Sequence, residues 1–161
     1  MELSEKSIKE LNRLKGLYPS RRSAVLMALH VVYDQFGFVG SEALGAAAEI
    51  LEIPVMDLQE AASFYTMFPR RKAGKYHIQV CRTLSCELRG SEELMRFLME
   101  KLKVEMGGVT EDGVFSLTEV ECLGSCGTGP MMQINDMYYE NLNRAKTEKI
   151  LKELRERAKN D

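Results

Sequence analysis

Two stretches of sequence decide the fold: YHIQVCRTLSC at residues 76–86 and VFSLTEVECLGSC at residues 114–126. Each begins with a run of apolar and β-branched residues that is typical of a strand, and each run ends at a cysteine. Adjacent strands that end at the same edge of a sheet place their following loops close together. The sequence therefore predicts that its four cysteines converge on one small volume: Cys81, Cys86, Cys122 and Cys126.

The pattern around these stretches predicts strands and helices in alternation. In chain order we expect a strand at 76–81, a helix at 91–103, a strand at 114–122, strands at 131–134 and 137–139, and a helix at 145–158. Asn135 and Asp136 suit a tight hairpin turn, because both residue types tolerate positive φ. This succession of a strand, a helix, a strand, a hairpin and a final helix is a thioredoxin-like order.

The first half of the chain shows helical spacing throughout. Its clearest stretch is residues 23–36, where apolar residues recur every three or four positions, and Ser41 is the expected N-cap of a following helix. Residues 69–75 have no apolar period and contain a proline and a glycine, so they are predicted to form a linker. The predicted fold class is therefore α+β, with a helical bundle at 1–70 and a thioredoxin-like domain at 76–161.

Length and composition are those of a globular protein. The 161 residues are 45% hydrophobic and 29% charged, and a formal charge of −2 gives no reason to expect nucleic acid or an anionic membrane as a partner. No apolar run is long enough to span a bilayer, and the N-terminus lacks the features of a signal or transit peptide. We therefore expect a cytoplasmic protein without direct membrane insertion. Because that compartment keeps thiols reduced, metal or redox chemistry is expected of the cysteines rather than structural disulfides.

The cysteine spacing narrows this chemistry. The pairs are C-x(4)-C and C-x(3)-C, which a structural zinc site accepts, whereas a dithiol redox centre usually needs C-x-x-C. A [2Fe-2S] cluster takes two cysteines on each of two irons, and its width suits these longer loops. A Rieske centre needs two histidines, but His30 and His77 lie in a predicted helix and a predicted strand. The cluster is the leading interpretation, and zinc stays open.

The residues around the sulfurs favour an anionic cluster. Backbone N–H groups of a glycine-rich loop can turn toward sulfur without interference from Cβ atoms. This loop contains Gly124, Ser125, Gly127, Thr128 and Gly129. Positive side chains near the site would stabilise its reduced form and negative ones would oppose reduction. The charged residues closest in sequence are Arg82, Glu87, Arg89 and Glu121.

The chain has no sequence pattern of a nucleotide site or of a catalytic centre. It contains neither G-x-G-x-x-G after a strand nor G-x-x-x-x-G-K-[ST], so a nicotinamide nucleotide must bind elsewhere. No motif such as G-x-S-x-G joins its serines, histidines and aspartates into a nucleophilic site. We expect no catalytic acid, base or nucleophile.

Four segments together carry a resemblance to a known family. They are residues 63–68 (SFYTMF), 74–81 (GKYHIQVC), 119–126 (EVECLGSC) and 133–139 (QINDMYY). With this cysteine spacing, the chain resembles the small thioredoxin-like [2Fe-2S] subunits of respiratory NADH:quinone oxidoreductase, the E-type or 24 kDa-type subunits of complex I. The likeness is strong from about residue 55 to the C-terminus and looser in the N-terminal helices.

The resemblance implies a specific role. Cys81, Cys86, Cys122 and Cys126 would ligate one binuclear cluster, and the protein would pack against a larger subunit that holds FMN and the NADH site. It would carry single electrons within an NADH dehydrogenase module, peripheral on the cytoplasmic side of the inner membrane. Two alternatives stay open: the equivalent subunit of an NAD-linked hydrogenase or formate dehydrogenase, and a zinc-stabilised interaction module.

Overall fold

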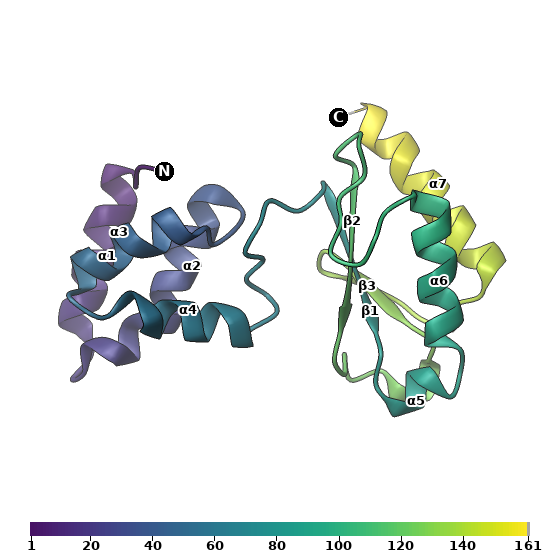
Figure 1. Cartoon of the computed structure of the whole chain (residues 1–161), viewed down its shortest axis with the longest axis horizontal. Helices are drawn as coiled ribbons and strands as arrows, with labels where there is room; N and C mark the ends of the chain where they lie inside the picture. Colours follow the sequence, from purple (N-terminus) through teal and green to yellow (C-terminus); the bar gives the residue numbers. More distant parts are fainter. Residues whose placement is uncertain (161) are drawn as a thin grey trace. The chain divides into compact units, whose positions relative to one another are not determined.

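The computed structural model describes residues 1–160 of the chain. The chain forms two compact units, with the boundary between Lys72 and Ala73. The first is helical and the second combines helices with one sheet, so the fold class is α+β as the sequence predicted (Figure 1). Each unit has a separate cluster of buried apolar side chains.

The first unit consists of helices only. They are α1 (Glu5–Leu17), the 3-10 helix η1 (Arg21–Ala24), α2 (Val25–Phe36), α3 (Ser41–Leu51) and α4 (Val55–Phe64). The Ser4 hydroxyl caps α1 by accepting a hydrogen bond from the Ser7 N–H at 3.2 Å. Ser41 was expected as a cap but is the first residue of α3, and Gly40 stands at the cap position. Each long helix buries one apolar stripe in a shared core, which includes the fully buried Leu11, Leu29, Leu51 and Leu58.

The second unit contains a four-stranded sheet. Its elements are β1 (Tyr76–Cys81), α5 (Leu84–Glu87), α6 (Ser91–Leu102), β2 (Phe115–Val120), the 3-10 helix η2 (Cys126–Thr128), β3 (Met132–Ile134), β4 (Met137–Tyr139) and α7 (Arg144–Asn160). The strand order is β2-β1-β3-β4, in which β1 and β2 are parallel and the other neighbours antiparallel. Asn135 lies between β3 and β4 with φ of 51°, so the predicted hairpin turn is confirmed.

Helices α6 and α7 cover one face of this sheet (Figure 1). Beneath them Ile78 pairs with Leu117 on β2 and with Ile134 on β3, and all three side chains are buried. Strand β2 ends at Val120, two residues before the predicted end at Cys122, and the short helix α5 was not predicted. Both differences occur where the chain leaves the sheet to form the cysteine loops.

Gly74 allows the chain to enter β1 close to β2. A Cβ atom at this position would lie 2.5 Å from the carbonyl carbon of Phe115 and 2.7 Å from the Ser116 nitrogen. Those neighbours are backbone atoms of a paired strand, so they cannot yield as a flexible side chain would. This close approach explains the glycine directly before the Lys75-Tyr76 start of the strand.

No helix within residues 1–160 is both long and apolar enough to cross a membrane.

Replacing Leu98 by alanine is expected to destabilise the protein by about 2–5 kcal/mol. Leu98 lies in α6, is fully buried, and packs in the core between the helices and the sheet. The matched control is Met95→Leu in the same helix, a volume-conserving change that should cost less than about 1.5 kcal/mol. Urea unfolding followed by circular dichroism measures both effects. Equal stability of the two variants would contradict this packing of α6 on the sheet.

Candidate metal centre

The four cysteines lie at the edge of the sheet where the two parallel strands end. Cys81 is the last residue of β1, and Cys122 follows the end of β2 by two residues. The two strand ends are held together by a hydrogen bond from the Arg82 N–H to the Val120 carbonyl at 3.0 Å. Cys86 lies in α5 and Cys126 begins η2, and these two short helices contact each other. Parallel pairing thus brings both cysteine loops to one place.

The four sulfurs form one group of interacting thiols. The Sγ atoms of Cys122 and Cys126 are 3.6 Å apart, and the Cys81 and Cys86 side chains also contact each other. Electrostatic interactions join the pairs, since Cys81 interacts with Cys122 and Cys126, and Cys86 with Cys126. All four are free thiols.

The two pairs differ in burial. Cys81 and Cys86 are each 1% exposed and pack with the fully buried Met131, whereas Cys122 and Cys126 are exposed. A group bound by all four sulfurs would therefore have an inner side within the protein and an outer side at the surface.

Burial and hydrogen bonding act in opposite directions on Cys81, one thiol of the inner pair. Burial would raise the pKa of Cys81, but hydrogen bonds from the Thr83 hydroxyl and from the backbone of Leu123 and Thr83 lower it overall. The Thr83 Oγ1 atom is 3.2 Å from the Cys81 sulfur. Burial and the neighbouring Cys81 raise the pKa of Cys86 to about 11. Cys81 is thus the more readily ionised thiol of the inner pair.

In the outer pair, too, the pKa of one thiol is lowered and that of the other is raised. The Gly124 N–H donates to the Cys122 sulfur at 3.3 Å, and this hydrogen bond, followed by that from Cys126, lowers the pKa of Cys122. The hydrogen bond with Cys122 and the charge of that thiolate raise the pKa of Cys126. In each pair, hydrogen-bond donors of the protein thus lower the pKa of one thiol.

The glycines of the Cys126 loop, defined here as residues 123–129, have different roles. Gly124 has φ of 80°, a conformation that other residues rarely adopt, and it directs its N–H toward sulfur. A Cβ atom at Gly129 would lie 3.1 Å from the Cys86 sulfur. At Gly127 a Cβ atom would meet nothing within 4 Å, so the surrounding atoms leave room for a larger residue at this position. Two of the three expected glycines therefore leave room for the sulfurs and their donors.

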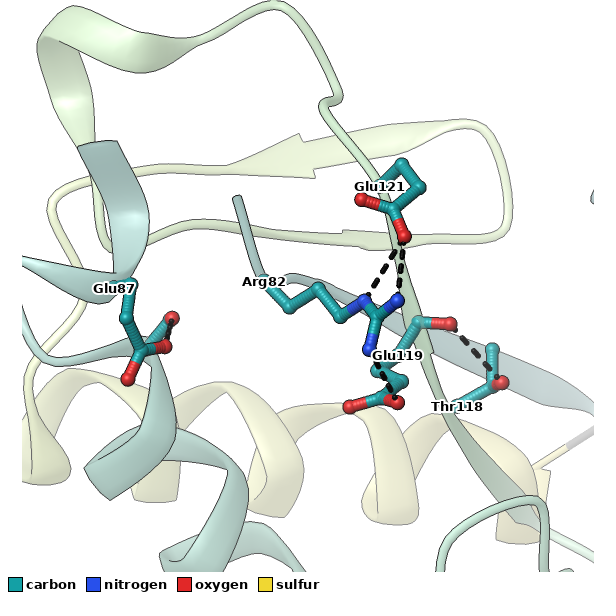
Figure 2. A network of polar contacts seen from close by, with 6 residues as sticks. Arg82, Glu87, Thr118, Glu119 and Glu121 are labelled. Carbon is teal, nitrogen blue, oxygen red and sulfur yellow. Dashed lines mark hydrogen bonds and ion pairs between the residues drawn. The ribbon is translucent and has the colours of Figure 1, made fainter. Parts of the chain in front are cut away.

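The charged residues nearest the cysteines in sequence are paired with other groups. The Arg82 guanidinium contacts Glu121 at 2.7 Å and Glu119 at 3.3 Å, as Figure 2 shows. The Glu87 carboxylate accepts a hydrogen bond from the Ser91 hydroxyl at 3.0 Å. Arg89 donates to the Gly127 carbonyl at 2.9 Å, so it supports the Cys126 loop. The Arg82 charge is compensated locally, which weakens the effect that the sequence suggested for it.

Neither histidine belongs to the group of thiols. The His77 Nδ1 is 2.8 Å from the Ser116 hydroxyl, and burial lowers the pKa of this histidine. His30 packs edge to face on Phe68 in the first unit, with ring centroids 4.9 Å apart. Neither histidine therefore adds a nitrogen ligand to the four sulfurs.

Four thiols in two pairs fit a binuclear cluster. Within residues 1–160, no three or more Cys, His, Asp or Glu side chains are placed so that they could hold a metal ion. In a [2Fe-2S] cluster each iron takes two cysteines and completes its coordination with bridging sulfide. The space beside Cys86 that a Cβ atom at Gly129 would fill, and the inward N–H of Gly124, also suit an anionic sulfur-rich group.

Sequence reasoning did not single out several residues that contact the site or its loop, among them Thr83, Ser85 and Glu140. The Thr83 hydroxyl interacts with Cys81 and also with Cys122, so it bridges the two pairs. The sequence offered a signal for Thr83, because this residue lies between two cysteines of one loop. Glu140 binds two hydroxyls of the Cys126 loop, and no sequence pattern pointed to it.

Comparison with known proteins gives a family and an independent view of the fold. The family model of the thioredoxin-like [2Fe-2S] ferredoxins matches residues 11–155. The E-type subunit of NADH-quinone oxidoreductase from Rickettsia prowazekii (strain Madrid E) is 45% identical over 139 residues, which cover 84% of this chain and 78% of that protein. An E-type subunit of the same enzyme from Rhizobium meliloti (strain 1021) is 38% identical over 146 residues, covering 91% and 87%.

A solved structure of an NAD+-reducing [NiFe]-hydrogenase in the air-oxidized state has a similar fold. The TM-score is 0.67 at 20% sequence identity, and the match covers 83% of this chain. This chain spans only 23% of the hydrogenase chain, so the likeness concerns one part of a longer protein.

The family model covers most of the chain, and relatives of similar length share more than a third of their residues with it. The chain belongs to the thioredoxin-like [2Fe-2S] ferredoxin family.

Proposed function

We propose that this protein is a one-electron carrier subunit of an NADH:quinone oxidoreductase, and that Cys81, Cys86, Cys122 and Cys126 bind its [2Fe-2S] cluster. The observation that carries the proposal is the convergence of four free thiols at one sheet edge in a chain of this family. Relatives at 38–46% identity are E-type subunits of NADH-quinone oxidoreductase.

When bound, a [2Fe-2S] cluster accepts and releases one electron. The protein's part is to hold and tune that group. The cysteines supply the ligands, the Gly124 N–H donates to the Cys122 sulfur, and the Thr83 hydroxyl donates toward Cys81. Such hydrogen bonds stabilise negative charge on sulfur, so they favour the reduced state.

In this proposal, a larger partner subunit carries out the other parts of the reaction. The chain lacks the sequence patterns that bind a dinucleotide, so FMN and NADH would be held by a larger subunit against which this one packs. The chain would then supply no acid, base or nucleophile of its own. As part of such a complex it would lie at the cytoplasmic side of the inner membrane.

The alternative host enzyme is an NAD-linked hydrogenase. The solved hydrogenase structure shares the fold at 20% identity, which supports the fold alone. The relatives from NADH-quinone oxidoreductase are far more similar and match this chain in length. They favour the complex I type of enzyme.

Replacing Cys122 by alanine is expected to abolish cluster assembly, because one iron would lose a protein ligand. The wild-type protein reconstituted with iron and sulfide should contain two irons and two sulfides, absorb visible light, and give a paramagnetic resonance signal after one-electron reduction. Met95→Leu, a change in the core of the same unit, is the control and should keep all three properties.

Two results would contradict the proposal. A Cys122→Ala protein with a full complement of iron and sulfide would show that this thiol is not a ligand. A wild-type protein that binds one zinc ion, and gives neither colour nor a paramagnetic signal after reconstitution, would identify the zinc-stabilised module instead.

The outer side of the site offers a contact surface for the flavin-binding subunit. Leu84 and Leu88 are 73% and 79% exposed at the start of α5 and directly after it. Ser85, next to Leu84, contacts the exposed Cys126. Because electron transfer slows steeply with distance, the flavin subunit must approach this exposed edge closely. Doing so would cover both leucines.

The double substitution of Leu84 and Leu88 by glutamate is expected to weaken binding of the flavin subunit by more than about 10-fold, since burying a leucine contributes about 1.5–3 kcal/mol. Leu17→Glu is the matched control, because Leu17 is 56% exposed on α1 of the other unit. Co-purification and titration with the flavin subunit measure the effect. The cluster absorption shows that the double variant is folded, and circular dichroism shows the same for Leu17→Glu. Unchanged affinity of the double variant would exclude this surface.

A further inference from the structure

Two hydroxyl residues stand on either side of Cys126. Ser125 precedes it and Thr128 closes the 3-10 turn that Cys126 begins, and the two hydroxyl oxygens are 2.6 Å apart. The Ser125 side chain makes no capping hydrogen bond to the backbone of that turn. A three-residue turn has few hydrogen bonds of its own, so its position depends on groups outside it.

Glu140 supplies such a group from the end of the sheet. One of its carboxylate oxygens, Oε1, accepts hydrogen bonds from the Ser125 hydroxyl and from the Thr128 hydroxyl, the latter at 2.6 Å. These two hydrogen bonds lower the pKa of Glu140, so its carboxylate is ionised and acts only as an acceptor. Hydrogen bonds to an ionised acceptor are about twice as strong as neutral ones.

The segment that carries Glu140 is itself fixed to the loop. The Asn141 N–H donates to the Thr128 carbonyl at 2.6 Å, and the Leu142 N–H donates to the Pro130 carbonyl at 3.0 Å. The Lys146 ammonium donates to the Glu140 carbonyl at 2.5 Å. Glu140 is therefore held from both sides and is half-buried.

The Cys126 loop has little freedom to move without disturbing the other thiols. Gly129 approaches Cys86 so closely that a Cβ atom would lie 3.1 Å from its sulfur. A shift of this loop therefore changes both the place of Cys126 and the space beside Cys86.

We propose that Glu140 is a positioning residue for the cluster: its carboxylate holds Ser125 and Thr128, and through them fixes the Cys126 sulfur relative to the other three. This inference rests on the proposed function, in which the four cysteines are the ligands. Glu140 touches none of the sulfurs, so it acts through the loop alone.

The test compares Glu140→Ala and Glu140→Gln with Glu148→Ala. Glu148 is an exposed carboxylate on α7 that pairs with Lys101, far in sequence from both cysteine loops, and serves as the matched control. Loss of an outer-shell group typically weakens metal binding roughly 10–100-fold, so iron release from reconstituted Glu140→Ala to a chelator should accelerate by about that factor. Glu140→Gln keeps an acceptor oxygen and should recover part of the loss.

Two further readouts separate positioning from general stability. The paramagnetic resonance spectrum of the reduced cluster should broaden or shift in Glu140→Ala and stay unchanged in Glu148→Ala. Thr128→Val removes one hydroxyl at nearly constant volume and should reproduce part of the effect. In a protein with both Ser125→Ala and Thr128→Val, adding Glu140→Ala should change iron release no further, because the groups through which it acts are gone.

The outcomes distinguish this inference from the proposed function. If the wild type forms the cluster and Cys122→Ala does not, but Glu140→Ala matches Glu148→Ala in iron release and in its spectrum, the positioning role is excluded and the proposed function stands. If the wild type forms no cluster at all, both are excluded. An undiminished effect of Glu140→Ala in the protein lacking both hydroxyls would also overturn the positioning role.

Discussion

The parallel pairing of β1 with β2 is the constraint on which the rest of the site depends. Its register, from Tyr76 opposite Phe115 to Cys81 opposite Val120, makes both strands end at the same edge. The buried Ile78 and Leu117, which pair within that register under α6 and α7, stabilise it. A shift by one residue would turn these side chains out of the core, so the apolar core also fixes where the cysteines stand.

The site built on this edge is asymmetric in two respects. One thiol pair is buried and the other exposed, and within each pair one thiol receives more hydrogen bonds than its neighbour. The buried pair would keep solvent from one side of a bound group, while the exposed pair would leave the other side open to a partner. This arrangement would suit the one-electron carrier proposed above.

The glutamates around the site have different structural roles. Glu119 and Glu121 compensate the charge of Arg82 at the surface, where such pairs contribute little to stability. Glu140 instead binds hydroxyls of the Cys126 loop and is half-buried. Sequence proximity to the cysteines drew attention to Glu121 and not to Glu140, because a residue fifteen positions from Ser125 reaches it only through the hairpin of β3 and β4.

The sequence by itself determined the α+β class, the order of the strands and the longer helices, the hairpin at Asn135 and the convergence of two cysteine pairs. These follow from side-chain periodicity, turn residues and spacing, which are local properties of the chain. Only the tertiary structure decided that β2 ends at Val120, which thiols are buried, that Arg82 is compensated and that Glu140 holds the Cys126 loop. Each of these depends on contacts between residues far apart in the chain, and such contacts exist only after the sheet has formed.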